Sequence, residues 1–581
     1  MTTLRARPLK LRGLADASAL TALGSLHPVL ARLYATRGIL RLSELETGLQ
    51  CLAPVGSLKG IERAVEVLMA CRERRIVVVG DFDVDGATST ALVLRCLRDF
   101  GFADVDYLVP NRFEYGYGLT PEIVRVAAQS SPSLLLTVDN GISSIEGVAE
   151  ARREGIEVLI TDHHLPGREL PLAAAIVNPN LQDSTFRSPH LAGVGVAFYL
   201  MAALGKEVQQ EGRASAARIP ARYLDLVALG TIADVVGLDQ NNRILVTQGL
   251  ARIRAGKCVA GIAALLASSG RDIGRVNSSD LGFAVGPRLN AAGRLEDMSL
   301  GIECLLTDDA DIALRLANVL DGINRERREI ETSMRDQAFS FVDRMTDSRL
   351  PGCVCVYQES WHQGVVGLVA ARVRERCHRP AVAFARDHDG QLKGSARSVP
   401  GVHIRDVLEA VSTACPGLVQ KFGGHAMAAG LSIASGNLNA FSRLACEQLS
   451  RLYPRADFSG ALLTDGVLPP ASLNLDFARI LRDAGPWGAD FPEPVWSGDF
   501  HLVEQRTVGE SHLKLKVRLL DGSVAVDAIA FNQAGAAYRG SVRLAYRLEV
   551  NEWRGAQSLQ LVIEQITDLS SSRWPASFMN A

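Results

Sequence analysis

Acidic residues and histidines stand at the ends of several apolar segments, and their types are those of a metal-dependent phosphoesterase. They are Asp81, Asp83 and Asp85 after residues 76–79, Asp139 after 134–138, Asp162, His163 and His164 after 158–160, and Asp234 after 224–230. Carboxylate oxygens bind hard divalent cations, while a neutral imidazole suits the metals from Mn²⁺ to Zn²⁺. The combination predicts a site for two divalent cations, Mn²⁺ or Mg²⁺.

The spacing within these segments indicates which side chains can bind metal and which can face substrate. Asp81, Asp83 and Asp85 are spaced by two, so in an extended segment they leave the backbone on one side and can converge on cations. Asp81 has an alternative role in capping or ordering the loop. His163 and His164 are adjacent and point to opposite sides of an extended backbone, so we expect one to bind metal and the other to face substrate.

The apolar segments predict the fold that positions these groups. Runs without alternation suit strands buried on both faces, which occur in parallel sheets covered by helices. Helix-compatible stretches at 88–99, 121–128 and 144–153 lie between the runs. The order predicts an α/β fold with a doubly wound parallel sheet, in which ligands bind at the carboxyl ends of the strands.

Three further regions follow along the chain. Apolar residues recur at helical spacing from Leu316 to Met345 and predict a long helix that joins two domains. A second α/β unit follows at 354–452, with a helix at 365–377 and a strand at 381–384. Beyond Trp496, strands are expected near 513–519, 524–531, 544–550 and 559–566. We expect these to form a small antiparallel barrel, and its alternating basic strand suits an OB-fold.

Composition limits the classes of protein that the chain can belong to. The 581 residues suggest three to four domains, and 62 Lys and Arg against 64 Asp and Glu give a formal net charge of -2. Any nucleic-acid-binding surface must therefore be local. The ten cysteines lack a Cys-x-x-Cys pair, which fits a reducing, cytoplasmic location. No apolar run approaches the length of a membrane span, so we expect no membrane association.

Several segments resemble a known family when they are read together. The acidic segments and Asp162-His163-His164 resemble the DHH phosphoesterase superfamily. Residues 286–294, Gly-Pro-Arg-Leu-Asn-Ala-Ala-Gly-Arg, and 423–430, Gly-Gly-His-Ala-Met-Ala-Ala-Gly, are similar to accessory segments of one branch, the bacterial RecJ single-stranded-DNA exonucleases. The resemblance covers about Leu40 to Leu569, and the order of the motifs is more specific than any one of them.

The resemblance implies roles for the acidic segments. It makes Asp139 the bridge between two cations, with Asp83 completing one site and Asp85 and Asp234 completing the other. His163 is then a metal ligand and His164 contacts the scissile phosphate, while Asp162 orients an imidazole. The implied catalytic set is Asp83, Asp85, Asp139, His163, His164 and Asp234, and Asp81 joins the metal ligands.

The resemblance also implies a domain organisation and a group of residues that hold DNA. The domains would be an N-terminal segment 1–42, a DHH catalytic domain 43–266, a connecting segment with the long helix 267–350, a DHHA1-type domain 351–455 and an OB-fold domain 463–569. Arginines and small residues next to glycines suit phosphate. The implied DNA- and phosphate-binding residues are Arg112, His164, Arg288, Asn290, Arg294, Ser395, Arg397 and His425.

Other residues leave their role open. Arg112 lies among aromatic residues and glycines, a composition that suits a nucleotide. Trp553 and Arg554 are candidates to stack on bases, whereas Trp496 and Tyr546 are expected in the core. The basic residues Lys514, Lys516 and Arg518 either follow a phosphate backbone or form an ordinary solvated strand face.

The resemblance implies a metal-dependent exonuclease that degrades single-stranded DNA from the 5′ end to nucleoside 5′-monophosphates in repair and recombination. It also implies association with single-stranded-DNA-binding protein and a RecQ-type helicase, and we expect a monomer. An alternative is a DHH phosphatase that acts on oligonucleotides or small phosphate esters. Another is a non-catalytic DHH scaffold in replication, although such a scaffold would have lost ligands that this chain retains.

Overall fold

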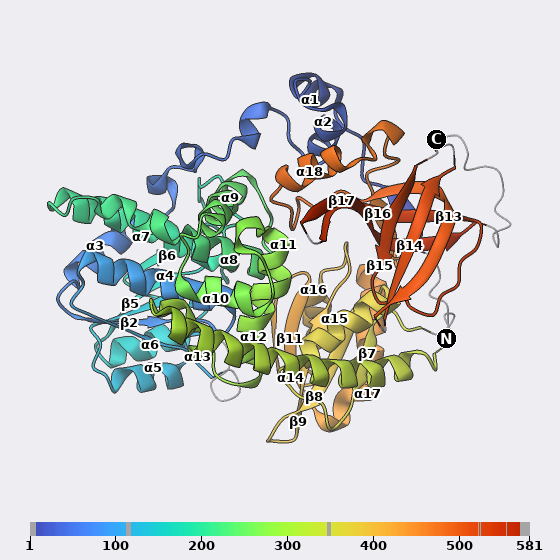
Figure 1. Cartoon of the computed structure of the whole chain (residues 1–581). Coiled ribbons are helices and arrows are strands. Elements are labelled where there is room, and N and C mark those ends of the chain that lie inside the picture. Colours follow the sequence, from blue (N-terminus) through green and yellow to red (C-terminus); the bar gives the residue numbers. More distant parts are fainter. Residues whose placement is uncertain are drawn as a thin grey trace. The chain divides into compact units, whose positions relative to one another are not determined.

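The computed structural model describes residues 7–111, 118–345, 350–509, 511–520, 522, 524–553 and 555–569. The chain forms two compact units. The first contains Met1–Gly286, Gly301–Leu316 and Ala461–Ala581, and the second contains Pro287–Leu300 and Ala317–Gly460. Figure 1 labels the helices and strands of both units.

The first unit contains a five-stranded parallel sheet in the order β3-β2-β4-β5-β6. Its strands are β2 (Arg75–Val79), β3 (Asp104–Leu108), β4 (Leu134–Val138), β5 (Glu157–Thr161) and β6 (Ala175–Val177). Every residue of β4 is buried, as are four of the five residues of β2. These strands confirm the parallel sheet that the apolar runs predicted.

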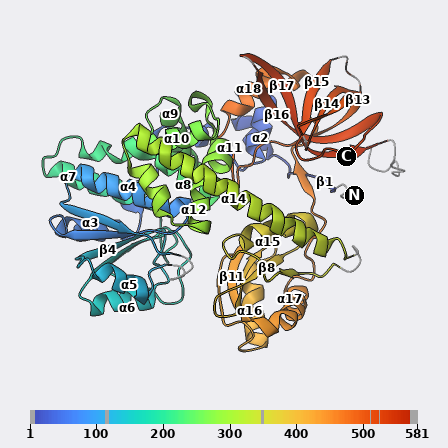
Figure 2. The same cartoon turned by 60° about the horizontal axis from the view of Figure 1, so that its bottom comes forward.

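Helices cover both faces of this sheet (Figure 2). On one face Ile123 of α5 (Pro121–Ala128) and Val148 of α6 (Ile145–Arg153) share an apolar cluster with Val77 and Leu135 of the strands. On the other face α4 (Val84–Phe100) packs against α7 (Gly193–Gln210) and α8 (Leu224–Asp234). Because helices cover both faces, functional side chains are expected at the ends of the strands.

Further helices complete this part of the chain. They are α1 (Ala17–Ala22), α2 (Pro28–Ala35), α3 (Ile61–Ala70), α9 (Gln240–Arg254), α10 (Ala260–Ser268), α11 (Ser278–Asp280), a π-helix η7 (Leu281–Val285), α12 (Gly286–Leu295), α13 (Ser299–Leu306) and α14 (Ala310–Val342). The 33 residues of α14 confirm the predicted long helix. The division between the two units falls inside it, at Leu316 and Ala317.

The second unit holds a mixed five-stranded sheet in the order β10-β11-β9-β8-β7. Its elements are β7 (Val354–Tyr357), α15 (Val366–Cys377), β8 (Ala381–Arg386), β9 (Gln391–Arg397), α16 (Ile404–Ala414), β10 (Lys421–Gly424), β11 (Ala428–Ala434) and α17 (Leu438–Leu452). Strands β7 and β8 are parallel, and the other pairs are antiparallel. The structure confirms the predicted second α/β unit.

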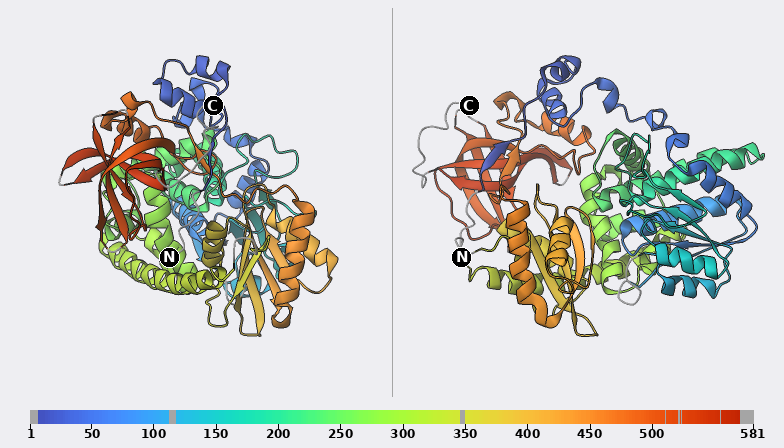
Figure 3. Two further views of the ribbon diagram at one scale, coloured as in Figure 1. Left: turned by 90° about the vertical axis from the view of Figure 1, so that its right-hand side faces the viewer. Right: turned by 180° about the vertical axis from the view of Figure 1, so that it is seen from behind.

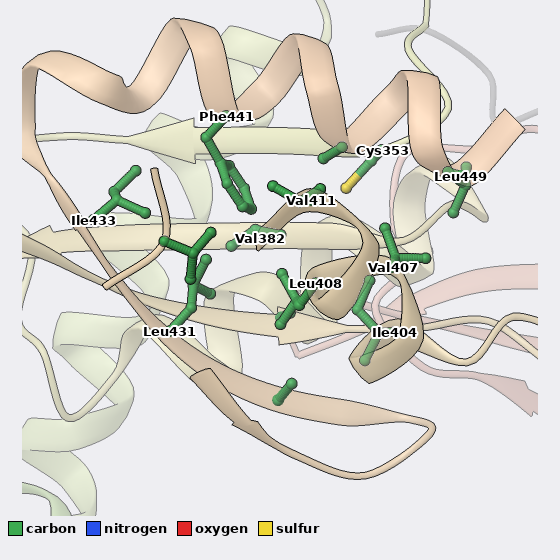
Figure 4. Close-up of a cluster of buried hydrophobic side chains, with 14 of the residues drawn as sticks. Cys353, Val382, Ile404, Val407, Leu408, Val411, Leu431, Ile433, Phe441 and Leu449 are labelled. Carbon is green, nitrogen blue, oxygen red and sulfur yellow. The ribbon is translucent and has the colours of Figure 1, made fainter. Parts of the chain in front are cut away.

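One face of this sheet packs on α16 and α17 (Figure 4). Phe441 of α17 and Val407 of α16 lie in one buried cluster with Val382 and Leu431 of the sheet. Cys353 belongs to the same cluster and Cys355 packs against it, as expected for thiols on one face of a strand. All ten cysteines are described, and each is a free thiol.

The last part of the chain forms a closed barrel in the order β13-β14-β15-β17-β16, red in Figure 3. The strands are β13 (Trp496–Val508), β14 (His512–Leu519), β15 (Ala525–Ala530), β16 (Ser541–Trp553) and β17 (Ala556–Asp568). The barrel is confirmed, but the prediction that it is antiparallel is wrong for one pair, because β15 and β17 run parallel. A parallel pair closes the barrel where two non-consecutive strands meet.

The barrel is tied to the N-terminal residues within the first unit. Strand β1 (Leu9–Leu11) pairs with β12 (Leu462–Thr464), which precedes α18 (Leu475–Asp483). Arg37 makes a buried bidentate ion pair with Asp465, at 2.9 and 3.1 Å. Trp496 and Tyr546 are buried in the barrel core, as predicted. Among the described residues, none of the helices is long and apolar enough to cross a membrane.

Candidate functional site

The loop between β2 and α4 carries Asp81, Asp83 and Asp85, but it is not extended. Asp83 is the N-cap of α4, and its side chain accepts a hydrogen bond from the backbone N–H of Gly86 at 3.1 Å. A Cβ at Gly86 would lie 2.5 Å from the carbonyl oxygen of Asp81, so the turn requires glycine. The extended arrangement predicted for the three carboxylates is therefore wrong, because Asp85 belongs to the first turn of a helix.

Two backbone N–H groups hold the carboxylate of Asp85. Gly193 N and Val194 N, in the first turn of α7, donate to its two oxygens at 2.6 and 2.9 Å. A Cβ at Gly193 would also lie 2.6 Å from Cβ of Asp139, so only glycine fits between the two acids. Gly193 and Val194 were not among the residues predicted from the sequence. The signal was the run Gly193-Val194-Gly195 at the start of an apolar helix, where N–H groups attract anions.

Asp139 follows β4 with a left-handed backbone, at φ 62°. Asp adopts this conformation more readily than most residues, and such positions are common at functional sites. Its N–H donates to the carbonyl of Thr161 at 3.0 Å, while the side-chain amide of Asn140 donates to the carbonyl of Val79 at 3.1 Å. These hydrogen bonds connect the carboxyl ends of β4, β5 and β2 and fix the position of Asp139.

The Asp162-His163-His164 segment is also held by hydrogen bonds. Oδ1 of Asp162 accepts the N–H groups of His163 and His164 at 2.7 and 3.0 Å and lies 2.7 Å from Nδ1 of His164. The side chains of Asn178 and Asn180 donate to the carbonyls of His164 and His163 at 2.9 and 2.6 Å. The prediction that Asp162 orients an imidazole is met at His164. Neither asparagine was predicted as a site residue from the sequence.

The two imidazoles do not point to opposite sides, as an extended backbone would have placed them. Their ring centroids lie 4.5 Å apart, with a tilt of 57°. The segment follows the last residue of β5 as a loop, so alternation of side chains no longer applies. Nε2 of His163 lies 3.1 Å from Oδ1 of Asp139 and 3.5 Å from Oδ2 of Asp234, whereas His164 faces Asp162.

The structure brings the predicted metal ligands together as an acidic cluster. We use this name for Asp81, Asp83, Asp85, Asp139, His163 and Asp234. Asp81, Asp83 and Asp139 form one group that could hold an ion, Asp85, His163 and Asp234 form another, and Asp139, His163 and His164 form a third, each with ligand atoms within 4.8 Å of one another. Asp234 is the last residue of α8, one turn beyond the helix end that the sequence indicated.

The electrostatics of the acidic cluster require a compensating positive charge. Burial first, and the neighbouring carboxylates second, raise the pKa of Asp85 and of Asp139 well above the ordinary value. Burial also raises the pKa of Asp234. Ionised carboxylates so deeply buried are costly unless they are paired or bind metal.

The donor set fits divalent cations. Burial lowers the pKa of His163, which favours the neutral imidazole that ligates metal. Its buried Nε2 has no hydrogen-bond partner among the described residues, although carboxylates surround it. For His164, burial acts to lower the pKa, but the hydrogen bond and charge of Asp162 outweigh it and raise the pKa to about 9. One neutral imidazole among carboxylate oxygens suits Mn²⁺ or Mg²⁺.

A polar group lies on the β9–β11 part of the second unit. Nη1 of Arg397 donates to Oγ of Ser395 at 2.9 Å, and both side chains come from β9. His425 follows β10 and donates its N–H to the carbonyl of Ala428, which pairs in register with Arg397. The structure therefore places Arg397, which bonds to Ser395, beside the turn between β10 and β11 that carries His425. We call these three residues the β9–β11 group.

The start of α15 borders this group. A Cβ at Gly367 would lie 2.8 Å from Nη2 of Arg397 and 3.0 Å from Oγ of Ser395. Gly367 is in the first turn of α15, where backbone N–H groups have no partner within the helix. Gly367 was not predicted as a site residue. The only indication of it in the sequence is the dipeptide Val366-Gly367 at the start of a helix. Guanidinium, hydroxyl and helix N-terminus are a set of groups that suits an anion.

The predicted DNA-binding residues of α12 are Arg288, Asn290 and Arg294, and the two arginines contact other parts of the protein. Nη2 of Arg288 lies 2.7 Å from Oδ1 of Asp321 on α14, and the arginine is buried. Nη1 of Arg294 donates to the carbonyl of Gly364 at 3.1 Å. Asn290 lies between them on α12 and is half-buried. In this structure Arg288 and Arg294 connect α12 to neighbouring elements of the second unit, and Arg112 lies outside the described residues.

Comparison with known proteins agrees with this fold. Three family models match: DHH family, N-terminal domain, at residues 75–231; DHHA1 domain, at 350–451; and RecJ OB domain, at 464–565. The parallel sheet, the acidic cluster at its carboxyl edge and these matches define the class of DHH-domain proteins.

Individual relatives narrow this class. The single-stranded-DNA-specific exonuclease RecJ of Escherichia coli is 52% identical over 93% of this chain and 96% of its own length. The RecJ of Thermus thermophilus is 34% identical over 95% of this chain and 77% of its own length. The chain belongs to the family of RecJ single-stranded-DNA-specific exonucleases.

Solved structures agree. The crystal structure of Thermus thermophilus RecJ in complex with Mn²⁺ matches 98% of this chain and 80% of its own, with 30% identity and a TM-score of 0.80. The structure of the same protein in complex with Mg²⁺ matches 95% of this chain and 76% of its own, with 28% identity and a TM-score of 0.73.

Proposed function

We propose that this chain is a metal-dependent exonuclease that degrades single-stranded DNA from the 5′ end to nucleoside 5′-monophosphates. Its role would be in DNA repair and recombination. One observation carries the proposal: the acidic cluster lies at the carboxyl edge of the parallel sheet in a chain of the RecJ family. The family distinguishes this function from a phosphatase for small esters, and the complete set of ligands argues against a non-catalytic scaffold.

Within this proposal the acidic cluster holds two divalent cations, Mn²⁺ or Mg²⁺. When bound, such cations supply Lewis acidity and an activated water. Asp139 is shared, Asp81 and Asp83 complete one site, and Asp85, His163 and Asp234 complete the other. This division agrees with the two groups of ligand atoms within 4.8 Å that share no residue.

His164 has a separate role in the proposal, as a donor to the scissile phosphate. Its Nδ1 lies 2.7 Å from Oδ1 of Asp162, and the proposal assigns the contact with the phosphate to Nε2. Burial acts to lower the pKa of His164, but the hydrogen bond and charge of Asp162 raise it to about 9, which favours the protonated ring. A charged donor stabilises an anionic phosphate more strongly than a neutral one.

The remaining predicted residues would hold the strand. We assign Ser395, Arg397 and His425 to the 5′ end, because hydroxyl, guanidinium and helix N-terminus converge there. Arg112, Arg288, Asn290 and Arg294 would contact the DNA backbone. For Arg288 this requires the exchange of its ion pair with Asp321 for a phosphate.

The proposed domain organisation follows the same division of work. It consists of an N-terminal segment 1–42, a catalytic domain 43–266, a connecting segment 267–350, an accessory domain 351–455 and an OB-fold domain 463–569. Limited proteolysis with mass spectrometry tests these boundaries. Cleavage concentrated inside 43–266, with 351–455 left joined to both neighbours, would contradict them.

The direct experiment uses 5′- and 3′-labelled single strands and the corresponding duplex, with Mn²⁺, Mg²⁺ or EDTA. We expect labelled mononucleotide to appear first from the 5′ label on the single strand, and only with a divalent cation. Release first from the 3′ label would overturn the polarity. Hydrolysis of small phosphate esters without hydrolysis of the strand would favour a phosphatase.

We further propose a cytoplasmic monomer that works with single-stranded-DNA-binding protein and a RecQ-type helicase. The ten free thiols support a reducing compartment. Light scattering tests the monomer, and binding assays with each purified partner test the association. A stable dimer at micromolar concentration, or no binding to either partner, would contradict the corresponding part.

A further inference from the structure

The acidic cluster opens to solvent at Asp234 and His164. The side chains of these residues are 23% and 25% exposed, whereas those of Asp85 and Asp139 are 0% and 3% exposed. Asp83 is also partly exposed, and a phosphate can reach the cluster from the side of Asp234 and His164. The surface beside Asp234 decides which parts of the substrate other than phosphate can be accommodated there.

The residue that follows Asp234 is both strained and exposed. Val235 has φ 64° and ψ 29°, a left-handed conformation that is a genuine outlier for a β-branched residue. Its side chain remains 69% exposed. Packing in the core therefore does not explain the strain, and strained residues of this kind concentrate at functional sites.

A second exposed apolar side chain comes from the π-helix η7. Phe283 is 77% exposed, whereas its neighbours Leu281, Ala284 and Val285 are buried. The other exposed phenylalanines among the described residues are 42% and 49% exposed. Single π-helical turns are rare and frequently occur at functional sites.

The two exposed side chains belong to neighbouring segments of the first unit. The π-helix η7 packs against the end of α8, which carries Asp234. A Cβ at Gly282 would lie 3.3 Å from Cγ2 of Ile232, and a Cβ at Gly286 would lie 3.6 Å from Cβ of Ala233. Gly282, the residue before Phe283, therefore contacts the last turn of α8. Val235 is the residue directly after that turn.

We propose that Phe283 and Val235 form an apolar platform on which the nucleobase next to the scissile phosphate rests. This inference depends on the proposed function, because it assumes that a DNA strand enters the acidic cluster. Phe283 supplies an aromatic face, and Val235 supplies an aliphatic contact beside the proposed metal ligand Asp234. Both are positioning residues for the same reaction.

The chemistry of the platform selects an unpaired base as its occupant. A phosphate or a sugar gains little from an uncharged apolar surface, whereas every base has a flat face that stacks on an aromatic ring. Bases within a duplex already stack on their neighbours and are not free to do so. A platform beside the cluster therefore contributes to the preference for single strands without reading the sequence.

The test compares a normal single strand with a strand of the same length that carries abasic sites at its first nucleotides. For the wild-type protein we expect KM for the abasic strand to be about tenfold higher, since stacking on an aromatic side chain stabilises a bound base. Phe283→Ala should raise KM for the normal strand by about the same factor, leave kcat less affected, and abolish the difference between the strands.

Two variants separate stacking from a structural effect. Phe283→Trp should keep the preference for the normal strand, because the aromatic face remains. Phe341→Ala, which removes an exposed phenylalanine on α14, should leave both KM values unchanged. Thermal unfolding of each variant reports whether the fold is retained.

The inference is overturned if Phe283→Ala slows both strands equally, or if the wild-type protein does not distinguish them. Its failure is distinguishable from a failure of the proposed function. A wild-type protein that degrades single strands, with a Phe283→Ala variant that behaves identically, refutes the platform alone. A wild-type protein that hydrolyses neither strand refutes the proposed function, and anisotropy binding of the two strands then still tests the platform.

Discussion

The acidic cluster and the β9–β11 group differ in how their side chains are held. In the acidic cluster, backbone N–H groups at the start of α7 hold Asp85, and beside the cluster Asp162 accepts the backbone N–H groups of His163 and His164. In the β9–β11 group, Arg397 bonds to Ser395 on its own strand and His425 is exposed. The carboxylates of Asp85 and Asp162 are buried, whereas Ser395 and Arg397 are half-buried and His425 is exposed.

The difference agrees with the two tasks that we assign to these regions. Ligands that share cations must be held to within a fraction of an ångström, and backbone N–H groups at strand ends and helix starts achieve this. Residues that hold a flexible strand must adapt as it advances. We therefore expect substitutions in the cluster to affect turnover and substitutions in the β9–β11 group to affect binding.

The largest effect is expected for Asp139→Asn, which keeps the volume of the side chain and removes its charge. Turnover should fall by about a thousandfold or more, because the shared ligand of the proposed cations is lost. The metal-free fold should not lose stability, since the pKa of Asp139 is raised and its ionised form disfavours the folded state.

The matched control for that variant is Asp225→Asn. Asp225 is a buried acid of α8, but it accepts the N–H of Val259 at 2.7 Å and lies outside the acidic cluster. Its turnover should stay within a few-fold of the wild-type value. Single-turnover rates and thermal unfolding of both variants check the pair, and near-normal turnover by folded Asp139→Asn would refute the shared-ligand assignment.

Arg397→Ala should weaken binding of the strand without affecting binding of metal. We expect KM for a 5′-phosphorylated strand to rise about tenfold to a hundredfold, because a charge-assisted hydrogen bond to phosphate is lost. The affinity for Mn²⁺, measured by calorimetry, should not change. Arg386→Ala is the control, since Arg386 is an exposed arginine of β8 paired with Glu359 at 2.7 Å. Loss of bound Mn²⁺ in Arg397→Ala would contradict the division of roles.

The dependence of stability on metal and pH tests the cluster without catalysis. The raised pKa values of Asp85, Asp139 and Asp234 mean that the metal-free fold is favoured at low pH and loses stability as pH rises through these values. Cations bind the ionised ligands, so the increase in Tm caused by Mn²⁺ should be larger near about pH 7.5 than near about pH 5.

At a hundredfold excess over Kd, one bound Mn²⁺ stabilises the fold by about 2.7 kcal/mol. Calorimetric scans with Mn²⁺ or EDTA at both pH values measure the difference. Asp139→Asn serves as the control and should lose most of the gain. An equal gain at both pH values would argue against binding through these carboxylates.

The barrel should contribute less, through charge alone. Lys514 pairs with Asp527 at 3.3 Å, whereas Lys516 and Arg518 are exposed on the same strand. If all three contact phosphates, replacing them with alanine should change the slope of log K for strand binding against log salt concentration. The slope should become shallower by about two.

The control is Arg543→Ala, because Arg543 of the same barrel is paired with Asp499 at 2.6 Å. Substitution is preferable to removal of the barrel, since Arg37 and Asp465 form a buried ion pair at its base. An unchanged slope would leave the alternating charges as an ordinary solvated face.

The smallest effect is expected for Val235→Asn, which tests strain next to the cluster. Asn adopts the left-handed conformation more readily than valine, so the free energy of unfolding should rise by about 1 kcal/mol. Chemical denaturation measures this change. KM for the single strand should rise a few-fold if the platform is correct, whereas a less stable variant would contradict the assignment of strain.

Local sequence predicted the elements that carry the site. The apolar runs indicated β2, β4 and β5, and polar residues at their carboxyl ends indicated the acidic cluster. Periodicity also predicted α14 and four of the five strands of the barrel, but not β13. These predictions succeeded because burial on two faces or on one face imposes a period that single residues reveal.

The sequence by itself determined the types of the ligands and their attachment to strand ends. Only the tertiary structure decided that the rings of His163 and His164 lie 4.5 Å apart and that Gly193 and Val194 hold Asp85. The parallel pair of β15 and β17 was likewise absent from the local pattern. The physical reason is that hydrogen bonds between residues far apart in the chain set these positions, and such partners leave no trace in the spacing of either segment.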